Sequence, residues 1–114
     1  MRYLLLIATE PTPHMTEEAW GAMMAEYDEF GHWAEAKGWI RGGEALEDIT
    51  TATTVRIRDG ARIVTDGPFA ETKEHLGGYY LIDVPGLDDA IEAAARIPGA
   101  KIGTVEIRPV RELG

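Results

Sequence analysis

The segment ETKEH, residues 71–75, carries four ionisable side chains in five positions. If a helical turn begins at Thr72, Glu71 and His75 lie four positions apart on one face of that turn. A carboxylate placed there can orient an imidazole and raise its basicity, which suits proton transfer. Glu71 and His75 are therefore candidate catalytic residues. The simpler interpretation is a solvated charged loop, because runs of charge usually face water.

Residues next to this segment are candidates for ligand binding. Lys73 can balance the charge of a substrate, and Gly77 and Gly78 let the backbone pass close to a bound molecule. Tyr80 combines an aromatic ring with a phenolic hydroxyl. Each of these also has a structural alternative, since paired glycines serve tight strand packing and a tyrosine in a strand is first of all a core aromatic.

The tetrapeptide DGPF, residues 66–69, precedes the charged segment and has the composition of a turn. Asp66 can accept hydrogen bonds from backbone amides, glycine permits unusual backbone angles, and proline fixes the next one. The structural interpretation, which the composition favours, is a rigid corner with Phe69 as its aromatic anchor. In the functional interpretation Phe69 contributes to a binding pocket, and Asp66 is a third catalytic candidate that acts as a base or orients a histidine.

Several classes of site are disfavoured by what the sequence lacks. There is no cysteine, which excludes disulfides, thiolate metal sites and cysteine nucleophiles. The other histidines, His14 and His32, have spacings that match no metal-binding motif. Neither a nucleophile elbow nor a phosphate-binding or dinucleotide-binding glycine motif occurs. We therefore predict no metal and no cofactor.

Composition limits the setting in which these residues act. A length of 114 residues predicts a single domain over residues 1–114, and a formal net charge of -9 argues against nucleic-acid binding. No apolar run approaches the roughly 20 residues of a membrane helix. The apolar run near the N-terminus has strand character and no cleavage segment after it, so we expect a soluble, cytoplasmic protein.

The hydrophobic pattern predicts two helices and six strands that position the candidate residues. Thr16 caps a long helix that Gly38 ends, and its apolar face contains Trp20, Met23, Met24 and Tyr27. A second helix follows Pro85 and Gly86 and stops at Pro98 and Gly99. The expected strands are residues 2–8, 39–46, 53–58, 62–65, 78–84 and 105–108. Asp59 and Gly60 predict a hairpin whose loop has either two or three residues.

Without the hairpin, this order is strand, helix, strand, strand, helix, strand, the α+β arrangement of a ferredoxin-like βαββαβ sandwich. The first strand and residues 78–84 are apolar on both faces, although helices would cover only one face of the sheet. A second copy that packs sheet against sheet would cover the other face and give a dimeric α/β barrel. The alternative is that the hairpin or the C-terminal tail folds over the sheet within one chain.

The chain also resembles a known family, the YCII-related proteins, and within it the DGPF group. The resemblance runs through YLLLI, GGEAL, TATTVRIRDG, VTDGPFAETKEHLGGYYLIDV, LDDAIEAAARIP and VEIRPV. It implies the ferredoxin-like fold, a homodimer and a pocket between sheet and helices, and it suggests a link to extracytoplasmic-function sigma factors. Better studied relatives resemble a small hydrolase or lyase with a histidine on the first helix and an aspartate near the end of the second, positions that align with Tyr27 and Ile97.

Two functions fit these observations. In the first, the protein binds a small molecule and possesses an enzymatic activity of unknown reaction that uses Asp66, Glu71 and His75. In the second, it is a non-catalytic regulatory module linked to a sigma factor, with Trp33, Trp39 and the helix edges as an interaction surface.

Overall fold

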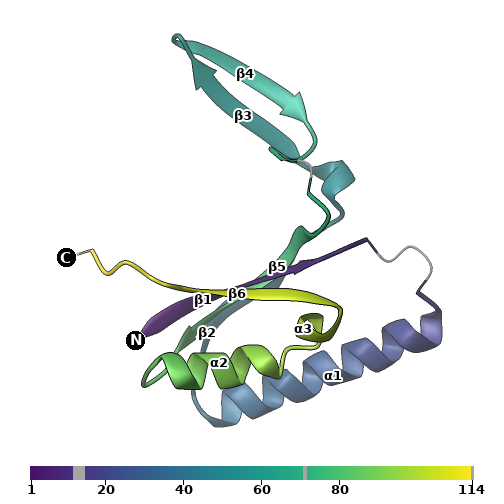
Figure 1. Ribbon diagram of the computed structural model, residues 1–114, viewed down its shortest axis with the longest axis vertical. Helices are drawn as coiled ribbons and strands as arrows, with labels where there is room; N and C mark the ends of the chain where they lie inside the picture. The colour runs from purple at the N-terminus through teal and green to yellow at the C-terminus, as the bar shows by residue number, and fades with distance from the viewer. Residues whose placement is uncertain (12–14, 71, 114) are drawn as a thin grey trace.

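The computed structural model describes residues 1–11, 15–70 and 72–113, and Figure 1 shows its arrangement. The described elements, in chain order, are β1 (Arg2–Thr9), α1 (Glu17–Ala36), β2 (Ile40–Ala45), a 3₁₀ turn (Ile49–Thr51), β3 (Thr53–Arg58), β4 (Ala61–Asp66), β5 (His75–Asp83), α2 (Leu87–Ala95), α3 (Gly99–Ile102) and β6 (Gly103–Pro109).

A four-stranded antiparallel sheet with the order β2-β5-β1-β6 forms the body of the protein. Strands β1 and β5, which are central, are those that the sequence predicts to be apolar on both faces. This strand order, with α1 and α2 on one side of the sheet, confirms the ferredoxin-like α+β fold (Figure 1). The sheet is open and does not close into a barrel, so the dimeric barrel stays a prediction.

The hydrophobic core lies between the sheet and the two long helices. Tyr3, Leu5 and Ile7 alternate along β1 and are buried, and they meet Phe30 and Ala34 of α1. The small side chains of α2 allow that helix to pack closely, and Ala90, Ala93 and Ala94 are all buried. The opposite face of β1 has Leu4 and Leu6, which are only partly buried.

The ends of α1 follow local chemistry. The Thr16 hydroxyl accepts a hydrogen bond from the Ala19 amide at 3.1 Å, and Glu17 and Glu18 occupy the first turn, as predicted. The helix ends before Gly38, whose φ of 71° is a left-handed conformation that glycine adopts without strain.

The predicted hairpin forms with a two-residue loop. Arg58 pairs with Ala61, and the two loop residues, Asp59 and Gly60, have φ angles of 51° and 77°. Positive φ at both positions matches the twist of the flanking strands. The hairpin β3-β4 forms its own two-stranded sheet and extends away from the body (Figure 1).

One local prediction was wrong. Residues 72–75 form no helical turn, because His75 already belongs to β5, three positions before the predicted start of that strand. The structure also contains an element that the sequence did not predict, since Gly99–Ile102 forms the short helix α3.

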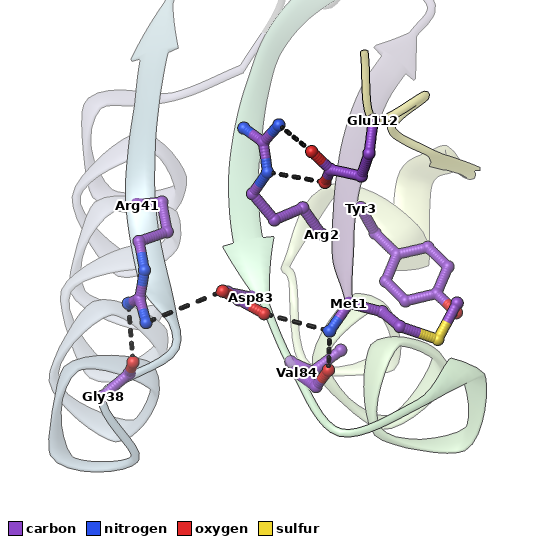
Figure 2. Close-up of polar contacts among 8 residues, drawn as sticks. All are labelled: Met1, Arg2, Tyr3, Gly38, Arg41, Asp83, Val84 and Glu112. Carbon is purple, nitrogen blue, oxygen red and sulfur yellow. Dashed lines mark hydrogen bonds and ion pairs between the residues drawn. The ribbon is translucent and has the colours of Figure 1, made fainter. Parts of the chain in front are cut away.

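Polar contacts hold the chain ends against the sheet (Figure 2). The ammonium group of Met1 donates to Asp83 Oδ1 at 3.0 Å and to the Val84 carbonyl at 2.7 Å. The guanidinium of Arg2 donates two hydrogen bonds of 2.9 Å to the Glu112 carboxylate. Hydrogen bonding to the Met1 ammonium lowers the pKa of Asp83, and hydrogen bonding to Arg2 lowers the pKa of Glu112. The C-terminal tail is thereby held beside the first residue of β1.

Candidate functional site

A cavity of about 590 Å³ lies between the N-terminal half of α1 and strands β1, β2 and β5. We call it the α1 cavity. Its helix wall consists of Trp20, Met23, Met24 and Tyr27, which the sequence places on one apolar face. Only the later part of that face, with Phe30 and Ala34, is buried in the core. The side chain of Trp20 is 53% exposed, so this part of the apolar face lines an open space.

The strands facing this wall have little side-chain volume. Gly43 pairs with Tyr80 and Ala45 pairs with Gly78, and cross-strand partners project from the same face of a sheet. Because Tyr80 and Ile82 point towards the helices, Gly43, Ala45 and Gly78 are on that side too. Because these three residues have small side chains or none, they leave the space opposite the helix unfilled. A Cβ atom at Gly78 would lie 2.9 Å from the Glu44 carbonyl oxygen, so the glycine also permits close strand packing.

A β-bulge brings His75 to the cavity. Ile7 pairs with Gly78 and Ala8 pairs with Leu76, which leaves Gly77 without a partner on β1. This extra residue shifts the alternation of β5, so that His75 pairs with Thr9, on the same face as the buried Ile7. His75 and Thr9 both line the α1 cavity. Without the extra residue, simple alternation from Gly78 would place His75 on the opposite face.

Asp48 is an acidic residue in the lining of the same cavity as His75. Its carboxylate caps the 3₁₀ turn, where Oδ1 accepts a hydrogen bond from the Thr50 amide at 2.9 Å. Hydrogen bonds from the Thr50 backbone lower the pKa of Asp48, and the charge of His75 lowers it slightly further. Asp48 and His75 both line the cavity, so each contributes an ionisable side chain to it.

Two phenols also line the α1 cavity. Tyr27 comes from the middle of α1 and Tyr80 from β5, and both side chains are half-buried. Burial raises the pKa of Tyr27, and a hydrogen bond from the Gly99 backbone opposes this effect. Burial also raises the pKa of Tyr80, and the nearby Tyr27 adds to the rise. Both phenols therefore stay protonated at neutral pH.

These shifts predict a loss of stability in alkaline solution. Above pH 10.0, the ordinary phenol pKa, the unfolded chain releases protons that the folded protein retains. The free energy of unfolding should then fall as the pH rises towards the folded pKa values. The Tyr27→Phe/Tyr80→Phe double variant should show a shallower fall between pH 10 and 11 in urea unfolding. Equal slopes for the two proteins would contradict the prediction.

The structure does not gather all the predicted site residues. His75, Gly77, Gly78 and Tyr80 line the α1 cavity. Asp66 ends β4, paired with Thr53 in the hairpin, and lines neither this cavity nor the groove beside it. Glu71 lies outside the described residues, as does His14.

Phe69 and Lys73 lie outside the α1 cavity as well. Phe69 is 79% exposed and lines a neighbouring open groove, where His75 and Leu76 also contribute. Lys73 is exposed, with its Nζ 3.8 Å from Glu10 Oε1. At the DGPF corner the Gly67 amide donates to the Ala52 carbonyl at 2.7 Å, and Gly67 has a φ of 100°, which glycine adopts without strain. The exposed Phe69 does not act as a buried anchor for this corner within the single chain.

The two tryptophans of the interaction hypothesis pack on each other. Trp33 and Trp39 meet edge to face with centroids 5.4 Å apart, and both are partly buried. The Arg96 guanidinium lies 4.2 Å from the Trp33 centroid, and Lys37 lies 5.2 Å from that of Trp39. Cationic side chains therefore cover part of this aromatic pair.

Sequence reasoning missed the contributions of Asp48 and Tyr27 to the cavity. The turn signal after β2 could have pointed to Asp48 as a cap, but its proximity to His75 depends on the fold. Ile97, at the position of the relatives' aspartate, is fully buried. In the described ranges there is no cluster of three His, Asp or Glu side chains that could hold a metal. None of the described helices combines the length and apolar character needed to cross a membrane.

Comparison with known proteins agrees with the sequence resemblance. The chain matches the YCII-related domain over residues 1–114. It is also 49% identical over 67 residues to an uncharacterised protein of Rhizobium meliloti (strain 1021). That match covers 57% of this chain and 54% of the relative, so it spans about half the length of the curated relative. The match over the full chain shows that the protein belongs to the YCII-related family.

Proposed function

We propose that the protein is a homodimer that binds a neutral or cationic small molecule in the α1 cavity. The observation that carries this proposal is the cavity itself, which has an apolar and aromatic wall and a few polar groups. Pockets for small molecules commonly combine these features at a volume of roughly 300–1,000 Å³. The space of about 590 Å³ falls within that range.

The charge of the lining argues against an anionic ligand. Glu10, Glu47 and Asp48 line the cavity, and among its described lining residues there is no lysine or arginine. Glu44 also borders the cavity, but it pairs with Tyr79, so its side chain projects from the outer face of the sheet. A phosphate or carboxylate would meet these acids without a lysine or arginine among the described lining residues, and His75 is the basic side chain that the lining offers. Repulsion between like charges is unfavourable at short range. A neutral or cationic molecule avoids this repulsion, and the aromatic wall favours contact with apolar groups or with a cation.

His75 and Asp48 support an enzymatic role for the same cavity. An imidazole near a carboxylate can accept and release protons near neutral pH. Under this proposal His75 is the proton-transfer group, and Asp48 is a carboxylate in the lining of the same cavity. Asp66 has no part in the reaction, because it lies in the hairpin and away from the cavity lining.

The dimer is supported by the outer face of the sheet. Leu4 pairs with Leu81 and Leu6 pairs with Tyr79, which gives an apolar stripe along the two central strands. All four side chains are partly exposed in the single chain. Charged residues flank the stripe on β6, where Glu106 and Arg108 pair with Leu6 and Leu4. An apolar centre with a polar rim is typical of an interface between copies.

A ligand screen by thermal denaturation tests the binding proposal. Neutral and cationic metabolites should raise the melting temperature, because a ligand at 100 times its Kd stabilises the folded state by about 2.7 kcal/mol. An Ala45→Trp variant, which places an indole in the cavity, should lose these shifts. Ile91→Trp is a matched control, since Ile91 is 49% exposed on α2 and does not line the cavity. Shifts that persist in Ala45→Trp, or that occur only with anions, would refute the proposal.

A further inference from the structure

We propose that the hydroxyl groups of Tyr27 and Tyr80 form the polar end of the α1 cavity and donate hydrogen bonds to an uncharged oxygen of the ligand, such as a ketone, ester or amide carbonyl. This inference rests on the proposed function. It adds the chemical class of the ligand and the residues that select it.

Both phenols are held by rigid elements. Tyr27 lies on α1, and Tyr80 lies on β5 in the middle of the sheet. The Tyr80 ring packs on the buried Phe30 with centroids 5.0 Å apart, and Tyr27 packs against the same core. Side chains supported in this way hold their hydroxyls in place before a ligand arrives, which reduces the entropy lost on binding.

The Tyr27 hydroxyl lies beside the backbone of Gly99. Burial raises the pKa of Tyr27, and the Gly99 backbone opposes this rise. A Cβ atom at Gly99 would lie 3.0 Å from that hydroxyl oxygen and 2.7 Å from Ile7 Cγ2, so glycine allows the close approach. Because Tyr27 lines the cavity, its hydroxyl can turn its proton towards an acceptor there.

The surrounding charges select an uncharged acceptor. Glutamate and aspartate side chains line the cavity, whereas no described lysine or arginine does. An anionic oxygen would be repelled by these carboxylates. A carbonyl oxygen carries no net charge and has two lone pairs that accept hydrogen bonds from neutral donors. The phenols are neutral donors at pH 7, because the ordinary phenol pKa of 10.0 lies well above that pH and burial raises it further.

A pair of probes that differ in one oxygen tests the inference. 2-Acetylnaphthalene and 2-isopropylnaphthalene have similar size and shape, but only the ketone accepts hydrogen bonds. Equilibrium dialysis at pH 7 should show that the wild-type protein binds the ketone about 2- to 10-fold more tightly, as expected for one or two net hydrogen bonds. Tyr27→Phe/Tyr80→Phe should bind both probes equally, with hydrocarbon affinity retained. Tyr3→Phe is the control, since this buried phenol lies outside the cavity lining and should leave the preference unchanged.

The outcomes separate this inference from the proposed function. If the wild-type protein binds both probes with equal affinity, or if the preference survives in the double variant, the phenols do not select the ligand, although the cavity still binds one. A wild-type preference for the ketone that the single variants Tyr27→Phe and Tyr80→Phe each reduce would support the inference even if the double variant did not fold. If neither probe binds to the wild-type protein more tightly than it binds to the Ala45→Trp variant, the inference and the proposed function both fail.

Discussion

Replacement of Leu6 by lysine should convert the proposed dimer into a monomer. Leu6 lies in the apolar stripe on the outer face of the sheet, beside Tyr79 on β5 and Glu106 on β6. In a face-to-face dimer the new ammonium group would lose water within the apolar stripe, whereas its neighbour Glu106 is an exposed residue at the rim. We expect a cost of about 3 kcal/mol or more, which corresponds to at least about 100-fold weaker association. Sedimentation velocity or light scattering at micromolar concentration measures the result.

The single chain should tolerate this substitution. The introduced ammonium group would face water in the monomer and lie beside the Glu106 carboxylate, which favours a cation. Ile91→Lys gives the same change in charge at a position 49% exposed on α2, away from the outer face, and should remain dimeric. A wild-type monomer at micromolar concentration would overturn the dimer proposal, and so would a dimer that survives Leu6→Lys.

Truncation of Leu5 should cause a large loss of stability. Leu5 is fully buried at the centre of β1, between Tyr80 of β5 and Ile107 of β6. Leu5→Ala removes buried apolar contacts and leaves a hole that the packed helices can fill only in part. The free energy of unfolding should fall by about 2–5 kcal/mol in urea denaturation.

A leucine at the surface provides the matched control. Leu87 begins α2 and is 52% exposed, so Leu87→Ala should change stability by less than about 0.5 kcal/mol. Similar losses for the two variants would show that the core does not lie where the structure puts it.

The sequence predicted the order of elements well because hydrophobic periodicity and capping are local signals. Thr16, Gly38 and the Asp59-Gly60 loop each determine a boundary through their own side-chain or backbone chemistry. The near-continuous hydrophobicity of β1 likewise predicted a strand that is apolar on both faces, and the structure shows that Tyr3, Leu5 and Ile7 are the residues on its core face. These features depend on a few neighbouring positions, and the structure confirms them.

The candidate site was harder to predict because it depends on contacts between distant segments. The bulge at Gly77 exists only because β1 pairs across it, and this pairing is what brings His75 to the cavity side. The apolar face of α1 predicted core packing for Trp20, but the glycines opposite supply no side chains to pack against. Neither the gap nor the bulge can be deduced from the periodicity of one segment.

The edges of the sheet restrict the ways in which this protein can associate with copies of itself. On β2, Ile40 pairs with Ile82 and Gly42 pairs with Leu81, so Arg41 has no partner on β5. This outer strand is therefore bulged as well as short. On the other edge, β6 ends at Pro109, which has no amide proton to offer to an incoming strand. Such edges are poor templates for adding further strands. Growth into open-ended fibres is therefore discouraged, and self-association through the face of the sheet would be complete once two copies had met.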